Sequence, residues 1–244
     1  MTGTGLADPY LKLTWAKKHL DTLDEDLLAF HNTNPCRIFA KEDLENQRYV
    51  LRVYLSDVPD HIPLRCGDAF YCMRSCLDQL VWRLAELKVS KPGHTQFPII
   101  ESWVNNEGSS KFIGWLPDVP DEAIAIIRDL QPANRATSPE SHPLWRLNAI
   151  CNLDKHRKIP AQGSHIALKL PTPPGTFRIE EFPNNTVLSV PLAEKSKLDM
   201  HPEVAFEVVF GDPEARVLIG PHEIRDIYKF VSNEVLPKFV RFFT

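Results

Sequence analysis

GDAFYCMRSCLDQLVWRLAELK, residues 67–88, decides the fold of this chain. Its hydrophobic side chains recur every three or four residues, which predicts a long helix with one apolar face in the core. Arg74 and Asp78 lie four residues apart at the border of that face, and Tyr71 and Trp82 extend the same side. The stretch therefore predicts a core helix with a polar group of side chains at its edge. The apolar face consists of Phe70, Met73, Leu77, Leu80, Val81 and Leu84.

Other stretches of the chain have the same helical periodicity. The N-terminal one offers Asp8 as a capping residue and Pro9 at the first helical position. A C-terminal helix should begin at Pro221 and kink or break near Pro237, because proline lacks the N–H group that a helix interior needs. The predicted helices are residues 6–33, 67–88, 121–131, 143–157 and 221–243.

Short runs of β-branched and aromatic residues predict strands in two regions. Residues 37–40 and 49–55 would form an N-terminal β-hairpin, and the short runs after residue 160 would form a small antiparallel β-meander. We therefore expect an α+β protein with a helical core. The first expected region is residues 1–160, which carry the hairpin at about 36–56 and a proline-rich loop at 89–141. The second is residues 161–244, which contain the meander and the C-terminal helix. We expect the second region to pack on the first as one globular unit.

The composition excludes several classes of protein. The 244 residues are 43% hydrophobic and 25% charged, which is ordinary for a globular protein with an ample core. A net charge of −4 gives no overall basic field for nucleic acid, although a local basic patch is compatible with it. The five cysteines are odd in number and predict reduced thiols. No run approaches about 18 apolar residues, so we expect a cytoplasmic protein with no membrane partner.

The helix predicted at 143–157 ends in NLDKHR, residues 152–157, and raises a question about Asp154. Asp154 falls near the centre of the helix face that should enter the core. A buried lone carboxylate is costly, so it should have a cationic or hydrogen-bonding partner. Arg74 could pair with it in bidentate fashion, with Asp78 on the other edge of the guanidinium. The flanking core positions are Leu144, Leu147, Ile150 and Cys151.

This polar cluster has two interpretations. It can be a structural clamp that holds two helices in register, with the basic residues as an ordinary helix C-cap. Alternatively it is an anion site in which Lys155, His156 and Arg157 surround a phosphate, His156 transfers a proton and Asn152 orients a ligand. The sequence predicts no metal site and no cofactor, because it contains no phosphate loop, dinucleotide fingerprint or zinc spacing.

The two motifs at 67–82 and 142–157, with TQFPI at 95–99 between them, resemble a broad group of uncharacterised bacterial and phage-associated proteins. The likeness spans residues 8–160. An arginine followed by a histidine in the first motif of that group is similar to the catalytic motif of HEPN helical domains. Many HEPN proteins are metal-independent ribonucleases of defence and toxin systems, whereas others only bind RNA or nucleotides. They often form dimers, so the resemblance implies a homodimer.

This chain departs from the pattern of the group at three positions. Arg74 is retained, but Gln79 occupies the histidine position and Tyr71-Cys72 replaces a His-Asn pair. Glutamine does not titrate near neutral pH, so the resemblance implies either a loss of cleavage or a transfer of the proton step to His156.

The sequence leads to one principal hypothesis and two rivals. The principal one is a HEPN-like protein that binds RNA or a nucleotide phosphate, either as a degenerate module or as a metal-independent ribonuclease. Arg74 and Arg157 would hold the phosphate, and His156→Ala would abolish any cleavage. The rivals are a non-catalytic interaction module with a structural clamp and an enzyme for an anionic small molecule. The predicted catalytic residues are His156 and Arg74, and the predicted ligand-binding residues are Arg157, Lys155, Asn152, Asp154, Asp78 and Tyr71.

Overall fold

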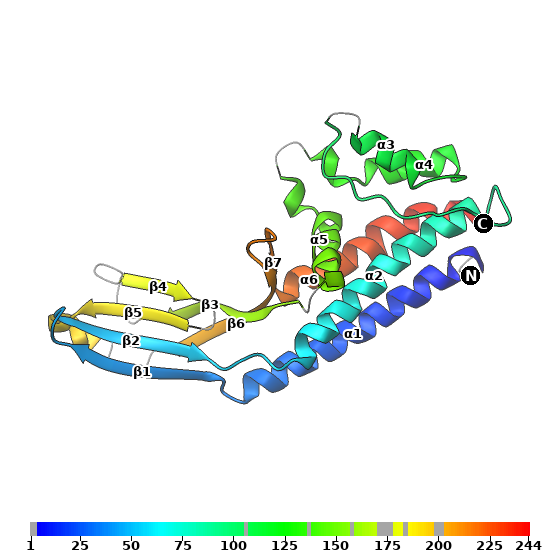
Figure 1. Cartoon of the computed structure of the whole chain (residues 1–244). Coiled ribbons are helices and arrows are strands. Elements are labelled where there is room, and N and C mark those ends of the chain that lie inside the picture. Colours follow the sequence, from blue (N-terminus) through cyan, green and yellow to red (C-terminus); the bar gives the residue numbers. More distant parts are fainter. Residues whose placement is uncertain are drawn as a thin grey trace. The chain divides into compact units, whose positions relative to one another are not determined.

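The computed structural model describes residues 4–104, 107–135, 138–156, 159–169, 178–182, 185–197 and 203–244 (Figure 1). It is a mixture of helices and antiparallel strands, as the periodicity of the sequence predicts. The chain forms two compact units, which we call the helical unit and the β unit. The helical unit comprises Met1–Leu23, Leu64–Ile159 and Gly211–Thr244, and the β unit comprises Asp24–Pro63 and Pro160–Phe210.

Six α-helices are present in the described part of the chain. They are α1 (Ala7–Asn32), α2 (His61–Ala85), α3 (Glu107–Gly114), α4 (Asp121–Asp129), α5 (Pro143–His156) and α6 (Pro221–Lys229). Short 3-10 turns lie at Thr4–Leu6, Pro132–Asn134, Pro139–Ser141 and Leu192–Lys197. All of the longer predicted helices are thus found, although α2 begins at His61, six residues before its predicted start.

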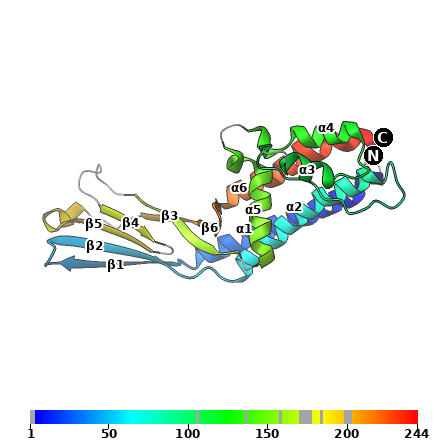
Figure 2. The ribbon, with the colours of Figure 1, turned by 45° about the horizontal axis from the view of Figure 1, so that its top comes forward.

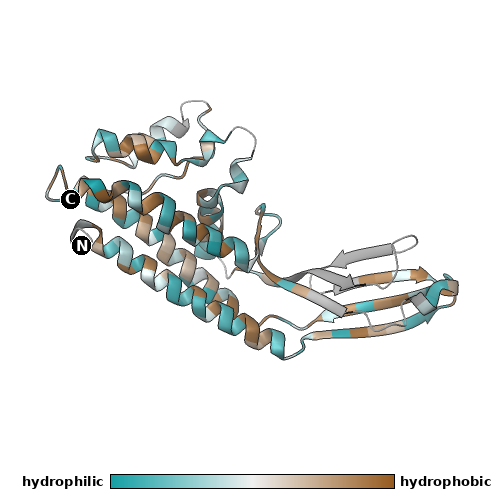
Figure 3. Cartoon of the chain, turned by 180° about the vertical axis from the view of Figure 1, so that it is seen from behind, coloured by the Kyte–Doolittle hydropathy of each residue, from teal (hydrophilic) through white to brown (hydrophobic). Residues whose placement is uncertain are grey.

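Helix α2 is buried along the predicted apolar face. The six residues of that face are each 0% exposed: Phe70, Met73, Leu77, Leu80, Val81 and Leu84. Helix α5 lies across α2 in both ribbon views (Figures 1 and 2) and buries Leu144, Leu147 and Ile150 completely. Hydrophilic and hydrophobic colours both run along α1 and α2 in Figure 3, as expected for helices that bury one face.

The two ends of the helical unit differ from the predicted details. Helix α1 begins at Ala7, so Asp8 lies inside the first turn instead of capping it, and its carboxylate pairs with Arg83 of α2. The C-terminal helix begins at Pro221 as predicted and changes character before Pro237. It continues as a π-helix over Phe230–Val235 and as a 3-10 helix over Leu236–Phe242. These changes of winding accommodate the missing N–H group of Pro237.

The β unit contains the predicted N-terminal hairpin. Its strands are β1 (Cys36–Asp43) and β2 (Arg48–Leu55), joined by a tight turn in which Gln47 has a φ of 51°. Strands β5 (Asn185–Pro191) and β4 (Arg178–Phe182) complete a four-stranded antiparallel sheet in the order β1-β2-β5-β4.

The expected β-meander after residue 160 is wrong in its pairing. Strands β3 (Ala161–Lys169), β6 (Glu203–Asp212) and β7 (Val217–Ile219) form a separate sheet in the order β3-β6-β7, whereas β5 pairs with β2 of the N-terminal hairpin. The reason is hydrophobic. β2 and β5 share a buried cluster, which β2 could not bury within the hairpin alone. The cluster consists of Tyr49, Leu51, Leu188 and Val190.

This pairing also explains why the observed units differ from a boundary at residue 160. The hairpin belongs with β3, β4, β5 and most of β6, whereas β7 and the C-terminal helix belong with the helices that precede residue 160. HEPN-like packing of the helices remains a hypothesis from the resemblance.

Candidate functional site

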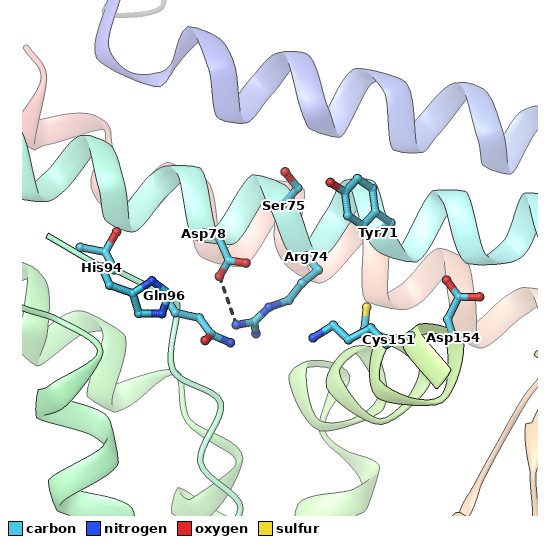
Figure 4. A pocket seen from close by; sticks show the side chains of 10 residues that line it. Tyr71, Arg74, Ser75, Asp78, His94, Gln96, Cys151 and Asp154 are labelled. Atoms are coloured by element: carbon cyan, nitrogen blue, oxygen red, sulfur yellow. Dashed lines mark ion pairs between the residues drawn. The ribbon is translucent and has the colours of Figure 1, made fainter. Parts of the chain in front are cut away.

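A pocket of about 290 Å³ opens within the helical unit (Figure 4). Helix α2 supplies one wall and helix α5 another. The third wall is the segment that follows α2, at residues 94–96. The lining residues are Tyr71, Arg74, Ser75, Asp78, His94, Thr95, Gln96, Cys151, Asp154 and Lys155.

Arg74 and Asp78 tie the third wall to helix α2. Nη2 of Arg74 donates a hydrogen bond of 2.7 Å to the carbonyl oxygen of Phe97, and lies 3.1 Å from Oδ1 of Asp78. The same Oδ1 accepts a hydrogen bond of 2.9 Å from the backbone N–H of Phe97. Arg74 and Asp78, which lie one helical turn apart on α2, form an ion pair. Together they satisfy both the carbonyl oxygen and the N–H group of Phe97.

The predicted Arg74–Asp154 ion pair is not formed. Among the residues that the structure describes, the ionic partner of Arg74 is Asp78. The carboxylate of Asp154 lies instead over Gly67 of α2, where a Cβ atom would be 2.8 Å from Oδ1. Glycine at position 67 therefore makes the room that this carboxylate occupies. The clamp predicted between two helices is a clamp between α2 and the loop.

Two buried polar atoms of the pocket wall have no hydrogen-bond partner in the described part of the chain. They are Nη1 of Arg74 and Oγ1 of Thr95. Arg74 is only 7% exposed. An unsatisfied buried donor costs about 1–3 kcal/mol, and more when it is charged. An acceptor that enters the pocket would therefore recover free energy at Arg74.

The environment of the pocket raises the pKa of both carboxyl groups. Burial raises the pKa of Asp78, against the opposing positive charges of Arg74 and Lys155. Burial also raises the pKa of Asp154, and the negative charge of Asp68 raises it further. A carboxylate with these neighbours gains stability from any hydrogen-bond donor that approaches it.

Cys151 lies in the pocket wall as a protonated thiol. Burial raises its pKa to about 12, and Sγ lies 3.6 Å from the carbonyl oxygen of Phe70, to which it donates a weak hydrogen bond. A thiolate is the reactive form of cysteine, so Cys151 is no nucleophile near neutral pH. All five cysteines are free.

The structure gathers five of the predicted site residues and separates others from them. Tyr71, Arg74, Asp78, Asp154 and Lys155 line one pocket. Asn152 and His156 are exposed on α5 and do not line it. The phosphate role predicted for Arg157 concerns a residue outside the described part of the chain.

Five further lining residues were not predicted from the sequence. They are Ser75, His94, Thr95, Gln96 and Cys151. A signal for three of them exists in the polar run His94-Thr95-Gln96, which is bounded by Gly93 and the buried Phe97. His94 lines the pocket, whereas His156 does not.

The described residues contain no group of three or more His, Cys, Asp or Glu side chains that could hold a metal ion. None of their helices is long and apolar enough to cross a bilayer. The chain matches no protein-family model, no curated protein and no solved structure. What the pocket binds must therefore be inferred from its own residues.

Proposed function

We propose that this pocket binds a phosphate-bearing ligand, either a nucleotide or one nucleotide unit of an RNA chain. The observation that carries the proposal is the buried guanidinium of Arg74, which lines the pocket and has one unsatisfied donor, Nη1. Guanidinium groups are well suited to phosphate oxygens because they are planar, always charged and rich in donors.

Arg74 is prepared for an anion before the ligand arrives. Its Nη2 is engaged by Asp78 and by the loop, so the guanidinium is held in place and little side-chain entropy is lost on binding. Lys155 adds a second cation to the pocket from helix α5. A held arginine with a nearby lysine favours a phosphate over a neutral ligand.

The size of the pocket limits what can enter. About 290 Å³ lies just below the range of roughly 300–1,000 Å³ that is usual for ligand pockets. This space suits a single sugar phosphate or nucleotide. A longer RNA would have to place one nucleotide in the pocket, so we expect single strands to bind in preference to duplexes.

The resemblance to HEPN proteins supports the same class of ligand and adds a second candidate function, a metal-independent ribonuclease. The observation in its favour is that His94 lines the same pocket as Arg74. A histidine can act as acid or base only within reach of the reacting atoms. In this proposal His94 takes the role that the sequence first suggested for His156, and a homodimer in a defence-type setting remains an expectation from the resemblance alone.

The clamp interpretation is compatible with binding. Arg74 and Asp78 secure the loop through Phe97, while the other side of the same guanidinium contacts the ligand. A pure clamp would bind nothing. The interaction module therefore remains as the alternative if no phosphate ligand is found.

The test is a calorimetric titration of the protein with adenosine 5′-monophosphate and with inorganic phosphate. Arg74→Lys keeps the charge but removes the planar fork, and we expect it to weaken binding at least tenfold, since a charge-assisted hydrogen bond contributes about 1.5–3 kcal/mol. Arg83→Lys is the matched control, because Arg83 lies on the same helix and pairs with Asp8 and Glu86 outside the pocket. Equal weakening in both variants, or no binding by the unmodified protein, would overturn the proposal.

A further inference from the structure

We infer that the pocket recognises the ribose hydroxyl groups of its ligand through Asp154, and so distinguishes ribose phosphates from their deoxy analogues. The inference rests on the proposed phosphate site and names what occupies its other end. Ribose phosphate is the chemistry that free ribonucleotides and RNA share.

The pocket has two chemically different ends. Figure 4 shows the guanidinium of Arg74 beside Asp78, and Asp154 well apart from it, with Cys151 between them. Arg74 and Asp154 form no ion pair, although both line the pocket. A ligand that spans the pocket therefore meets a cation at one end and a carboxylate at the other.

Arg74 determines where the phosphate lies. Its Nη1 is buried without a partner among the described residues, so a phosphate oxygen gains most at this end. Asp154 repels a phosphate and would orient the ligand with its anionic group away from this carboxylate. The Oγ1 of Thr95, which is buried and equally unpartnered, can donate to the same anion.

Asp154 is suited to hydroxyl groups. A carboxylate accepts hydrogen bonds at both oxygens, and an acidic side chain on the ribose hydroxyls is a recurring solution in nucleotide-binding proteins. The carboxylate is placed by close packing on Gly67, where a Cβ atom would come within 2.8 Å of Oδ1 and 3.0 Å of Oδ2. The carboxylate of Asp154 is half-buried and lies near the like charge of Asp68. Both features increase the stabilisation that this carboxylate gains from a hydrogen-bond donor.

A metal ion is a less suitable occupant of this end. Metal binding needs several ligands, and the described residues offer no group of three or more His, Cys, Asp or Glu side chains. Asp68 does not line the pocket, so Asp154 is the acidic group that a ligand meets there. Hydroxyl groups of a small ligand need only one such carboxylate.

The test compares adenosine 5′-monophosphate with 2′,3′-dideoxyadenosine 5′-monophosphate by calorimetric titration. We expect the unmodified protein to bind the ribonucleotide about tenfold more tightly, the factor that one charge-assisted hydrogen bond provides. Asp154→Ala should bring the two affinities together, and continued binding of inorganic phosphate would show that the variant is folded. Asp118→Asn, the control, should keep the preference, because Asp118 is exposed in a turn outside the lining.

The possible results separate this inference from the function on which it rests. If both nucleotides and inorganic phosphate bind through Arg74 but without preference for ribose, the phosphate site stands and the ribose inference is overturned. The same holds if Asp154→Ala keeps the preference. If neither nucleotide binds, the proposed function falls first. Ribose 5-phosphate and a pair of single-stranded oligomers, RNA and DNA, identify the source: preference for the free ribose phosphates indicates a nucleotide, and preference for the RNA oligomer indicates RNA.

Discussion

Arg74 donates a hydrogen bond of 2.7 Å from Nη2 to the carbonyl oxygen of Phe97, a residue 23 positions further along the chain. This contact joins helix α2 to the loop that forms a wall of the pocket. One side chain thus secures the wall and presents its remaining donor to a ligand. A substitution at Arg74 should therefore affect both the stability of the fold and the binding of a ligand.

Removal of the guanidinium should weaken the fold. Arg74→Ala would leave the carbonyl oxygen of the buried Phe97 without its donor and Asp78 without its ion pair. We expect a loss of about 2–3 kcal/mol in the free energy of unfolding, since a buried acceptor remains unsatisfied and Asp78 is still partly solvated. Chemical denaturation measures this loss in the free energy of unfolding. An unchanged midpoint would show that the loop is held by other contacts.

The pH dependence of stability should identify Asp154 as an unfavourable charge. Burial and Asp68 raise the pKa of its carboxyl group above the ordinary 3.8, so the folded state binds this proton more tightly than the unfolded state. The contribution of Asp154 to the free energy of unfolding therefore falls as the pH rises from 3.8 through the raised pKa, and this contribution stays low at neutral pH. Asp154→Asn should accordingly raise the melting temperature at pH 7 (a gain of 1 kcal/mol corresponds to roughly 2–4 °C in a chain of this size) and lose this gain towards acid pH.

The control for that prediction is Asp118→Asn. Asp118 is exposed in a turn with a φ of 63°, a conformation that asparagine adopts as readily as aspartate. The Asp118→Asn variant should have the same melting temperature as the unmodified protein, both at pH 7 and at acid pH. A lower melting temperature for Asp154→Asn at neutral pH would instead show that the carboxylate of Asp154 stabilises the fold.

Gly67→Ala should impair the ribose end of the pocket without touching Arg74. The new Cβ atom would stand 2.8 Å from Oδ1 of Asp154 and displace the carboxylate. We expect the preference for ribonucleotide over dideoxynucleotide to decrease several-fold. Gly114→Ala is the matched control, because nothing lies within 4 Å of its added Cβ atom. It should preserve the preference, and an equal effect of both substitutions would argue against the role of Asp154.

The two histidines can be separated by a cleavage assay on a total tRNA pool with EDTA present. If the protein is a ribonuclease, His94→Gln should reduce the cleavage rate at least a hundredfold, the usual minimum contribution of acid–base catalysis. His156→Gln should cleave almost normally, because His156 is exposed and outside the pocket lining. Loss of cleavage in the His156 variant alone would return the proton transfer to that residue. Binding without cleavage by the unmodified protein would indicate a degenerate module.

The sequence by itself determined the helices and the residues that they bury. The apolar repeat from Phe70 to Leu84 predicted which face of α2 enters the core, and all six of its residues are buried. Helical spacing predicts the buried face of a helix directly, because residues three and four positions apart lie on the same side of it. The same spacing brought Tyr71, Arg74 and Asp78 to one side of α2, and all three line the pocket.

Only the tertiary structure decided which distant groups meet. Strand β5 pairs with its chain neighbour β4 on one edge, but its other edge pairs with the distant β2, where Leu51 and Leu188 share a cluster. Arg74 could have met either Asp78 or Asp154, and the backbone of Phe97 favours the former by offering a donor and an acceptor together. Local periodicity describes one element at a time, whereas these choices depend on the fit between elements far apart in the sequence.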